Sequence, residues 1–206
     1  MRHNRRYKIT KGNRYFLVRE FDPADFGEQI YSLLVETCKT YKGIKASVDR
    51  EEILCAVKYW QSSYYKVYGA FFRENGELAG YTLLRKNDNC ISIPVYKTHP
   101  QYEKYQASAA LLNKMLQDHA DFLASGGYIC DGSRNIQHKT NFHGYLAKYF
   151  QFRRAYCRLH IIYHPRIRLF VKMLYPFRKI LRRLDGIRLI HNINGVLLME
   201  EISRSS

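Results

Sequence analysis

The sequence has few of the features that mark secreted, disulfide-linked or membrane-spanning proteins. Its five cysteines are odd in number and scattered without a CxxC pair, which argues against a disulfide framework and a structural zinc site and favours a reducing compartment. No run of 18 apolar residues occurs, so we expect no transmembrane helix. The first 19 residues carry seven basic side chains and no apolar core, so we expect no secretory signal and a cytoplasmic location.

Two common catalytic motifs are also missing. The chain contains no GxSxG nucleophile elbow of the serine hydrolases and no P-loop. Cys130, His138 and His143 are of metal-binding types, but their spacing fits no recognised zinc motif. We therefore expect neither serine-hydrolase chemistry nor a bound metal ion.

Acidic residues are absent from a long stretch of the chain. Between Gly132 and Leu184 there are 13 basic residues and no Asp or Glu, whereas the whole chain has 34 basic residues, 18 acidic residues and a net charge of +16. Repulsion among these charges costs stability, so the stretch predicts an anionic partner. The alternative is a basic surface that serves only solubility.

The residues that are present can build one folded domain, because 46% of the 206 are hydrophobic. Periodicity, capping residues and turn residues predict a polar basic arm and a succession of helices and strands. The expected arm covers 1–14; the strands cover 15–20, 67–73, 78–85, 90–96, 128–131 and 154–163; the helices cover 22–41, 49–60, 106–123 and 141–150. The three strands between 67 and 96 should form an antiparallel meander.

Residues 165–184 predict an amphipathic helix that Pro176 interrupts. Aromatic and aliphatic residues such as Phe177 recur at helical spacing, and basic residues fall on the other side. This pattern is typical of a helix lying in an anionic lipid interface, and residues 166–184 would be the contact. The alternative is a helix docked on the protein's own core. Residues 187–199 fit a strand or a helix equally well.

Chemically capable side chains concentrate after the expected strand at 128–131. Asp131 ends that strand, and His138 follows in a polar loop. Either could accept a proton from an attacking amine or hydroxyl, or Asp131 could orient His138. The alternative is that Asp131 bonds loop amides and His138 is a solvated loop residue. His99 and His143 are more typical of loop or capping histidines than of catalysts.

The order of elements, together with the segments THPQYEKYQASAALL at 98–112 and NFHGYLAKYFQF at 141–152, resembles the GNAT acyltransferases. That resemblance implies an α/β fold with a mixed, mostly antiparallel central sheet flanked by helices over 15–163, followed by a basic helical extension over 164–206. It implies an acyl-CoA donor whose pyrophosphate meets the helix start. The implied donor-binding residues are Lys104, Tyr105, Gln106, Ala107, Ser108 and Ala109.

The resemblance also covers the late helix. Asn141 and Phe152 match the family's spacing, Gln151 replaces its glycine, and Ala147 stands where a general-acid tyrosine is frequent. Tyr145 and Tyr149 flank that position, and either could substitute. The segment YICDGS at 128–133, followed by the ending KYFQF at 148–152, is similar to the Fem-type branch of the superfamily. The members of that branch are relatives of the peptidoglycan aminoacyltransferases.

These observations predict an enzyme that moves an acyl group from acyl-CoA, or an aminoacyl group from aminoacyl-tRNA, onto an amine or hydroxyl. The acceptor would be an envelope precursor, sugar or lipid at the inner face of the membrane. A backbone amide of the strand at 90–96 would stabilise the oxyanion. The alternative from another class is a non-catalytic basic module that binds RNA or an anionic membrane.

Overall fold

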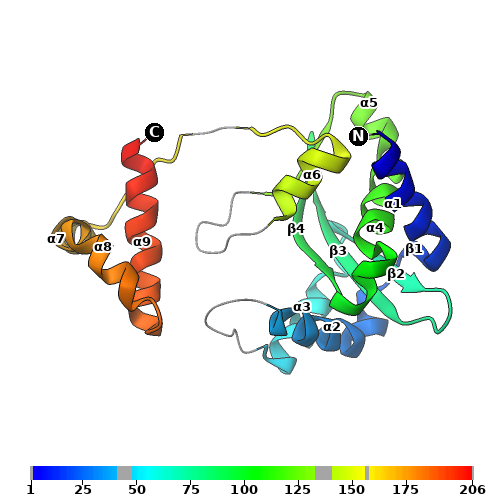
Figure 1. Cartoon of the computed structure of the whole chain (residues 1–206), viewed down its shortest axis with the longest axis horizontal. Coiled ribbons are helices and arrows are strands. Elements are labelled where there is room, and N and C mark those ends of the chain that lie inside the picture. The colour runs from blue at the N-terminus through cyan, green and yellow to red at the C-terminus, as the bar shows by residue number, and fades with distance from the viewer. Residues whose placement is uncertain (1, 41–47, 133–140, 156–157, 206) are drawn as a thin grey trace. The chain divides into compact units, whose positions relative to one another are not determined.

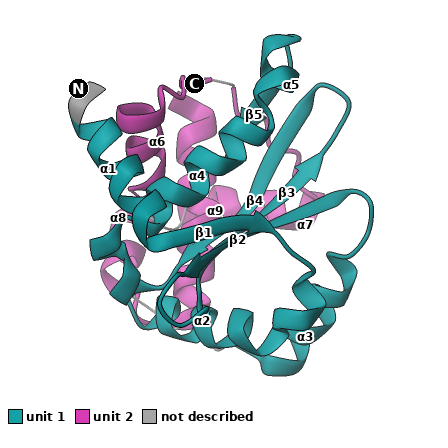
Figure 2. Cartoon of the chain, turned by 90° about the vertical axis from the view of Figure 1, so that its right-hand side faces the viewer, with its two compact units in different colours: residues 1–132 teal, residues 133–206 magenta. Residues whose placement is uncertain are grey.

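A five-stranded sheet in the order β1-β2-β3-β4-β5 organises the first part of the chain in the computed structural model, which describes residues 2–40, 48–132, 141–155 and 158–205. The chain divides into two compact units, Met1–Gly132 and Ser133–Ser206 (Figure 2). The strands are β1 (Phe16–Glu20), β2 (Tyr65–Phe72), β3 (Leu78–Lys86), β4 (Cys90–Thr98) and β5 (Tyr128–Cys130).

The first four strands are antiparallel neighbours, and β5 pairs with β4 in parallel. The predicted meander is confirmed. Short-range interactions determine its first turn, between β2 and β3. Gly76 has a φ of 73°, and the Asn75 side chain accepts a hydrogen bond from the Glu77 amide at 3.0 Å. The predicted α/β fold with a mostly antiparallel sheet is therefore present.

Helices cover both faces of this sheet (Figure 2). On one face lie α2 (Gly27–Lys39) and α3 (Arg50–Tyr59), which follow the short helix η1 (Pro23–Phe26). Asp22 and Asp49, the first residues of two helices expected from the sequence, cap η1 and α3 by accepting hydrogen bonds from the amides of Ala24 and Glu52. The core on this side contains Ile30, Leu33, Val57, Val67, Phe71, Tyr81 and Leu83.

Helix α4 (Ala107–Asp118) packs on the other face and buries Leu111, Leu112 and Met115 completely. The short helix η2 (Pro100–Tyr105) leads into it. The single helix expected over 106–123 ends at His119, whose Nδ1 lies 2.9 Å from the Met115 carbonyl, and α5 (Ala120–Ala124) follows.

The polar arm expected at 1–14 is a helix, α1 (Arg2–Tyr15), which packs along α4 (Figure 1). A Cβ added at Gly12 would lie 2.7 Å from the Gln106 carbonyl oxygen and 2.9 Å from the Ala110 Cβ. The helix therefore depends on a close approach that only glycine permits, and its sequence carries little apolar periodicity of its own.

The residues described in the second unit form helices and irregular segments. Its elements are α6 (Phe142–Phe150), α7 (Pro165–Leu174), η3 (Tyr175–Phe177), α8 (Arg178–Leu181), η4 (Arg182–Leu184) and α9 (Arg188–Ser205). Pro176 interrupts the predicted amphipathic helix as expected, and the open choice at 187–199 resolves to a helix. Among the residues described, none of these helices is long and apolar enough to cross a membrane.

The strand predicted at 154–163 is wrong. The part of this range that the structure describes has no regular secondary structure. β-Propensity expresses packing against neighbouring strands, so a segment with some aromatic and β-branched residues does not form a strand without a ladder partner.

The end of the second unit is held together by its few acidic side chains. Glu201 on α9 accepts hydrogen bonds from Arg178 and Arg182, and the Arg178 guanidinium lies 4.3 Å from the ring centroid of Tyr175. The buried Asn194 amide donates to the Leu181 carbonyl at 3.0 Å and to Asp185 at 2.6 Å. These contacts fix α9 against α8 and its following turn. The predicted domain boundaries at 14/15 and 163/164 stay a prediction.

Candidate active site

The strand pair β4–β5 separates partway along β4. Cys90, Ile91 and Ser92 pair with β5, which ends at Cys130, whereas β4 continues to Thr98. In the sheet formed by the described residues, the rest of β4 therefore has a neighbour on its β3 side only. A strand edge of this kind offers backbone groups to an extended ligand that carries amides of its own.

A β-bulge lies where the two strands separate. Leu83 pairs with Val95 and Arg85 pairs with Ser92, so β4 holds one more residue than β3 between these points. The extra length falls at Ile93–Pro94, and the Thr82 hydroxyl donates to the Val95 carbonyl at 3.0 Å. Because a bulge redirects the backbone and proline has no N–H, the amides available here are those of the residues beside Pro94. They lie within the strand predicted to supply the oxyanion donor.

The start of α4 is a junction held by side chains. Gln106 adopts a left-handed conformation with a φ of 68°, and its side-chain oxygen accepts a hydrogen bond from Lys8 of α1 at 2.8 Å. The Ser108 hydroxyl donates to Glu103 at 2.7 Å, and the Tyr96 hydroxyl donates to the Ser108 carbonyl at 2.7 Å. Side chains from β4, η2 and α1 thus converge on the first turn of α4.

The six predicted donor-binding residues occupy different positions at this junction. Lys104 is exposed, with its ammonium 5.0 Å from the ring centroid of Tyr105, while Ala107 and Ala109 are completely buried. Lys104 and Lys8 carry positive charge on the elements beside this helix start, whereas an anion there would compete with Glu103 for the Ser108 hydroxyl. Phosphate binding by these residues stays a prediction.

Sequence reasoning did not single out Lys8. It lies 98 residues before Gln106 in the chain, and only the packing of α1 on α4 brings the two together. The one available signal was charge, because α1 contains six Lys and Arg residues and no carboxylate. A cationic helix beside a helix N-terminus strengthens the attraction for an anion.

Of the four predicted catalytic residues, Asp131, Asn141 and Tyr145 belong to the described residues. Asp131 directly follows β5 and is half-buried, as expected for a group delivered by a strand, whereas His138 lies outside the described residues. Asn141 is exposed at the start of α6, and the Tyr145 ring contacts Tyr149 with 5.1 Å between ring centroids. Asn141 and Tyr145 belong to the second unit, so a single site that joins them to Asp131 stays a prediction.

Two cysteines lie in the paired part of β4 and β5, which Cys90 begins and Cys130 ends. The sulfurs of Cys90 and Cys130 lie 3.6 Å apart on β4 and β5. Burial, followed by the hydrogen bond to Cys130, raises the pKa of the Cys90 thiol. A raised pKa keeps the thiol protonated at neutral pH, which fits a packed residue better than a nucleophile. His99 has the capping role considered for it, since its Nδ1 accepts the Gln101 amide at 3.3 Å.

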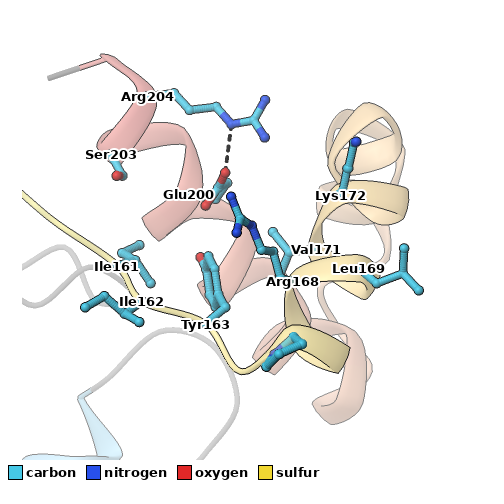
Figure 3. A pocket seen from close by; sticks show the side chains of 11 residues that line it. Ile161, Ile162, Tyr163, Arg168, Leu169, Val171, Lys172, Glu200, Ser203 and Arg204 are labelled. Atoms are coloured by element: carbon cyan, nitrogen blue, oxygen red, sulfur yellow. Dashed lines mark hydrogen bonds and ion pairs between the residues drawn. The ribbon is translucent and has the colours of Figure 1, made fainter.

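Two cavities occur among the described residues. One, of about 790 Å³, lies within the second unit, and its lining includes Tyr163 and Arg168 (Figure 3). Arg204 and Glu200, which also line it, form an ion pair at 2.8 Å. Another of about 410 Å³ is lined by residues of the first unit that include Trp60. Neither cavity is lined by Gln106 or by a residue of β4.

The chain matches no protein-family model and no curated protein. Its fold does match solved structures. AAC(6')-Iy, solved with the bisubstrate analogue CoA-S-monomethyl-acetylneamine, aligns with a TM-score of 0.52 at 8% identity, over 73% of this chain and 99% of that one. A ribosomal-protein-alanine N-acetyltransferase from Brucella melitensis biovar Abortus 2308 aligns with a TM-score of 0.50 at 14% identity, over 72% and 99%.

The chain has the GNAT fold. An aminoglycoside 6'-N-acetyltransferase, AAC(6')-Ih from Acinetobacter baumannii, shows the same likeness, with a TM-score of 0.50 at 8% identity over 72% of this chain and 98% of that one. The predicted resemblance to GNAT proteins is thus confirmed at the level of the fold. Within the GNAT fold, the Fem-type branch stays a prediction.

Proposed function

We propose that the protein is an N-acyltransferase that uses acyl-CoA as donor. The observation that carries this proposal is the separation of β4 from β5 beside a bulge, within a GNAT fold. The part of β4 that continues past its pairing with β5, Ile93–Thr98, is an edge against which an amide-containing donor arm could lie as an added strand. After this edge the chain passes through η2 to the start of α4. The donor's phosphates would bind at that helix start.

The chemistry requires three contributions from the protein. An acceptor amine or hydroxyl attacks the thioester carbonyl, its proton passes to a base, and the thiolate leaves with a proton from an acid. Asp131 or His138 would be the base. An amide beside Pro94 would hold the oxyanion, and Tyr145 would be the acid, with Tyr149 as the alternative. Asn141, at the start of the same helix as Tyr145, would position the reacting groups.

The proposed acceptor is an envelope precursor, a sugar or a lipid at the inner face of the membrane. The strongly basic second unit supports an anionic or surface-bound acceptor. The similarity of residues 128–133 and the 141–152 ending to the Fem-type branch keeps aminoacyl-tRNA as the alternative donor. Because transfer from aminoacyl-tRNA would need no acyl-CoA, an experiment can distinguish the two donors.

The proposed donor site can be tested at Ser108. Ser108→Glu should weaken acyl-CoA binding by roughly tenfold or more, because it places a second carboxylate beside Glu103 at the helix start. Ser108→Ala, which removes only the hydroxyl, is the matched control and should bind the donor nearly as the parent does. Thermal stabilisation by a panel of acyl-CoAs measures the binding. Equal stabilisation of the parent and Ser108→Glu would place the phosphates elsewhere.

The proposed base can be tested by turnover. Asp131→Asn and His138→Asn should each be assayed for release of the CoA thiol in the presence of an amine acceptor. Loss of a general base lowers kcat by about 10²–10⁴-fold while donor binding stays unchanged. If aminoacyl-tRNA stabilises the protein against thermal unfolding and no acyl-CoA does so, the donor is the alternative, aminoacyl-tRNA.

A further inference from the structure

The three acidic residues of the second unit are all engaged inside that unit. Asp185 lies 2.9 Å from the His191 ring and accepts from Asn194, Glu200 accepts from Arg204 at 2.8 Å, and Glu201 accepts from Arg178 and Arg182. The same unit contains 15 Lys and Arg residues. Its own carboxylates therefore leave most of its positive charge uncompensated, so a large negative partner would relieve the repulsion.

A line of large apolar side chains is exposed along α7, η3, α8 and η4. Its members recur every three or four residues, and each is between 49% and 60% exposed. This line, the apolar stripe, consists of Ile167, Phe170, Met173, Phe177, Ile180 and Leu184. The stripe includes Phe177 of the apolar face predicted from the sequence, and the other described residues of the second unit leave about half of each of its side chains exposed.

The buried face of the same segment is a different one. Val171 is the buried residue of α7, Asn194 and Leu197 are buried on α9, and the Leu181 carbonyl accepts from Asn194. Packing against α9 thus uses other positions. The apolar stripe is not the contact that holds the second unit together, so a cover for it must come from outside this contact.

Cations accompany the stripe. Arg178 and Arg182 are bound to Glu201, but Lys172, Lys179 and Arg183 are exposed, and no carboxylate of the described residues forms an ion pair with them. Their spacing of seven and four residues is that of one helical side. The segment therefore presents apolar side chains and uncompensated charge together, whereas a nucleic-acid surface would need only the charge.

We propose that the segment Pro165–Leu184 binds the surface of an anionic phospholipid bilayer, with the apolar stripe inserted at the level of the acyl chains. Lys172, Lys179 and Arg183 would contact the lipid phosphates. The segment lies in the interface and does not span the bilayer, which agrees with its length and charge. The inference goes beyond the proposed function, because binding to lipid requires neither donor nor acceptor.

The test is sedimentation of the full chain with vesicles of phosphatidylcholine, with and without phosphatidylglycerol. The parent should bind only the anionic vesicles. Phe177→Ser with Ile180→Ser should weaken binding by roughly a hundredfold, because each substitution removes an inserted apolar side chain. Lys179→Gln with Arg183→Gln should weaken it by about twenty-five-fold, since each basic residue near the surface is worth roughly fivefold. High salt should reproduce the second effect and not the first.

Control variants distinguish the loss of the apolar stripe from the loss of any exposed apolar side chain. Leu17→Ser with Tyr64→Ser alters two apolar side chains of the first unit that are 47% and 70% exposed, and this variant should bind like the parent. Circular dichroism and thermal unfolding should show that every variant is folded. The inference is overturned if the parent ignores anionic vesicles, if the stripe variant binds as tightly as the parent, or if the parent prefers RNA in direct competition. It is also overturned if the stripe proves to join two copies and the dimer binds no vesicles.

Discussion

At the scale of single residues, the clearest electrostatic feature is the thiol of Cys90. It begins β4, at the start of the pairing with β5, and its sulfur lies 3.6 Å from that of Cys130 on β5. Burial is the main reason that its pKa lies above the ordinary value. A thiol reacts with alkylating agents as the thiolate, so its reaction rate reports this environment directly.

Cys90 should therefore be alkylated more slowly than the exposed Cys55 at neutral pH. The rate for Cys90 should rise through an inflection above about pH 8.5, the ordinary value for a cysteine. Cys130→Ser should lower that inflection only in part, because burial is the larger cause and the neighbouring thiol the smaller one. Mass spectrometry of labelled peptides measures both rates, and an inflection for Cys90 at or below the ordinary value would contradict the assignment.

At the scale of elements, the packing of α1 on α4 depends on one glycine. Gly12→Val should cost about 1–3 kcal/mol of unfolding free energy, because the added carbons collide with the Gln106 carbonyl and Ala110. Thr10→Val introduces the same side chain at an exposed position of the same helix and should change stability little. Urea denaturation measures both. A stable Gly12→Val protein with protected α1 amides would show that the helix does not need this contact.

The docking of α9 should depend on pH through Glu201. Hydrogen bonds from Arg182 and then Arg178 lower the pKa of this carboxyl below its usual range. The stability that they supply is present above the unfolded pKa of about 4.3 and is lost as the pH falls through the lower folded value.

Acidification should therefore destabilise the parent in that window, and Glu201→Gln should flatten this part of the curve. Glu74→Gln, on the turn between β2 and β3, is the control. Thermal unfolding across the acidic range measures the difference, and identical profiles for the parent and Glu201→Gln would remove the residue from the docking.

The contrast between elements explains what the sequence could predict. The meander β2–β4 and the helix starts at Asp22 and Asp49 could be predicted, because they depend on alternation and on short-range hydrogen bonds. Helix α1 was missed because its stability comes from a distant contact. The strand expected at 154–163 is wrong because none of the strands in the described part of the chain pairs with it. The position of Asp131 after β5 was local and predictable, whereas Lys8 beside Gln106 was not.

At the scale of the whole molecule, charge is distributed unequally. Residues 1–132 carry 19 basic and 15 acidic side chains, and residues 133–206 carry 15 basic and three acidic ones, which gives net charges of +4 and +12. Net charge far from zero opposes the compact state through self-repulsion. The folded protein should therefore be sensitive to ionic strength.

We expect the unfolding temperature to rise with added salt, and more steeply with sulfate or phosphate, because screening reduces the repulsion in the second unit. Lys179→Gln with Arg183→Gln should raise the midpoint at low salt and weaken its salt dependence. A salt series in differential scanning calorimetry measures this. A midpoint that falls as salt increases would show that attractive pairs, such as those of Glu201, outweigh the repulsion.

The contact between Gly12 and the start of α4 also restricts how this protein can change over evolutionary time. A side chain at position 12 has no room while the Gln106 carbonyl and Ala110 stay where they are. Positions 12 and 110 should therefore vary together, with glycine facing a small residue in every homologue that keeps the first helix. A homologue that combines bulky residues at both positions should have lost that helix or moved it, and with it the lysine that reaches Gln106.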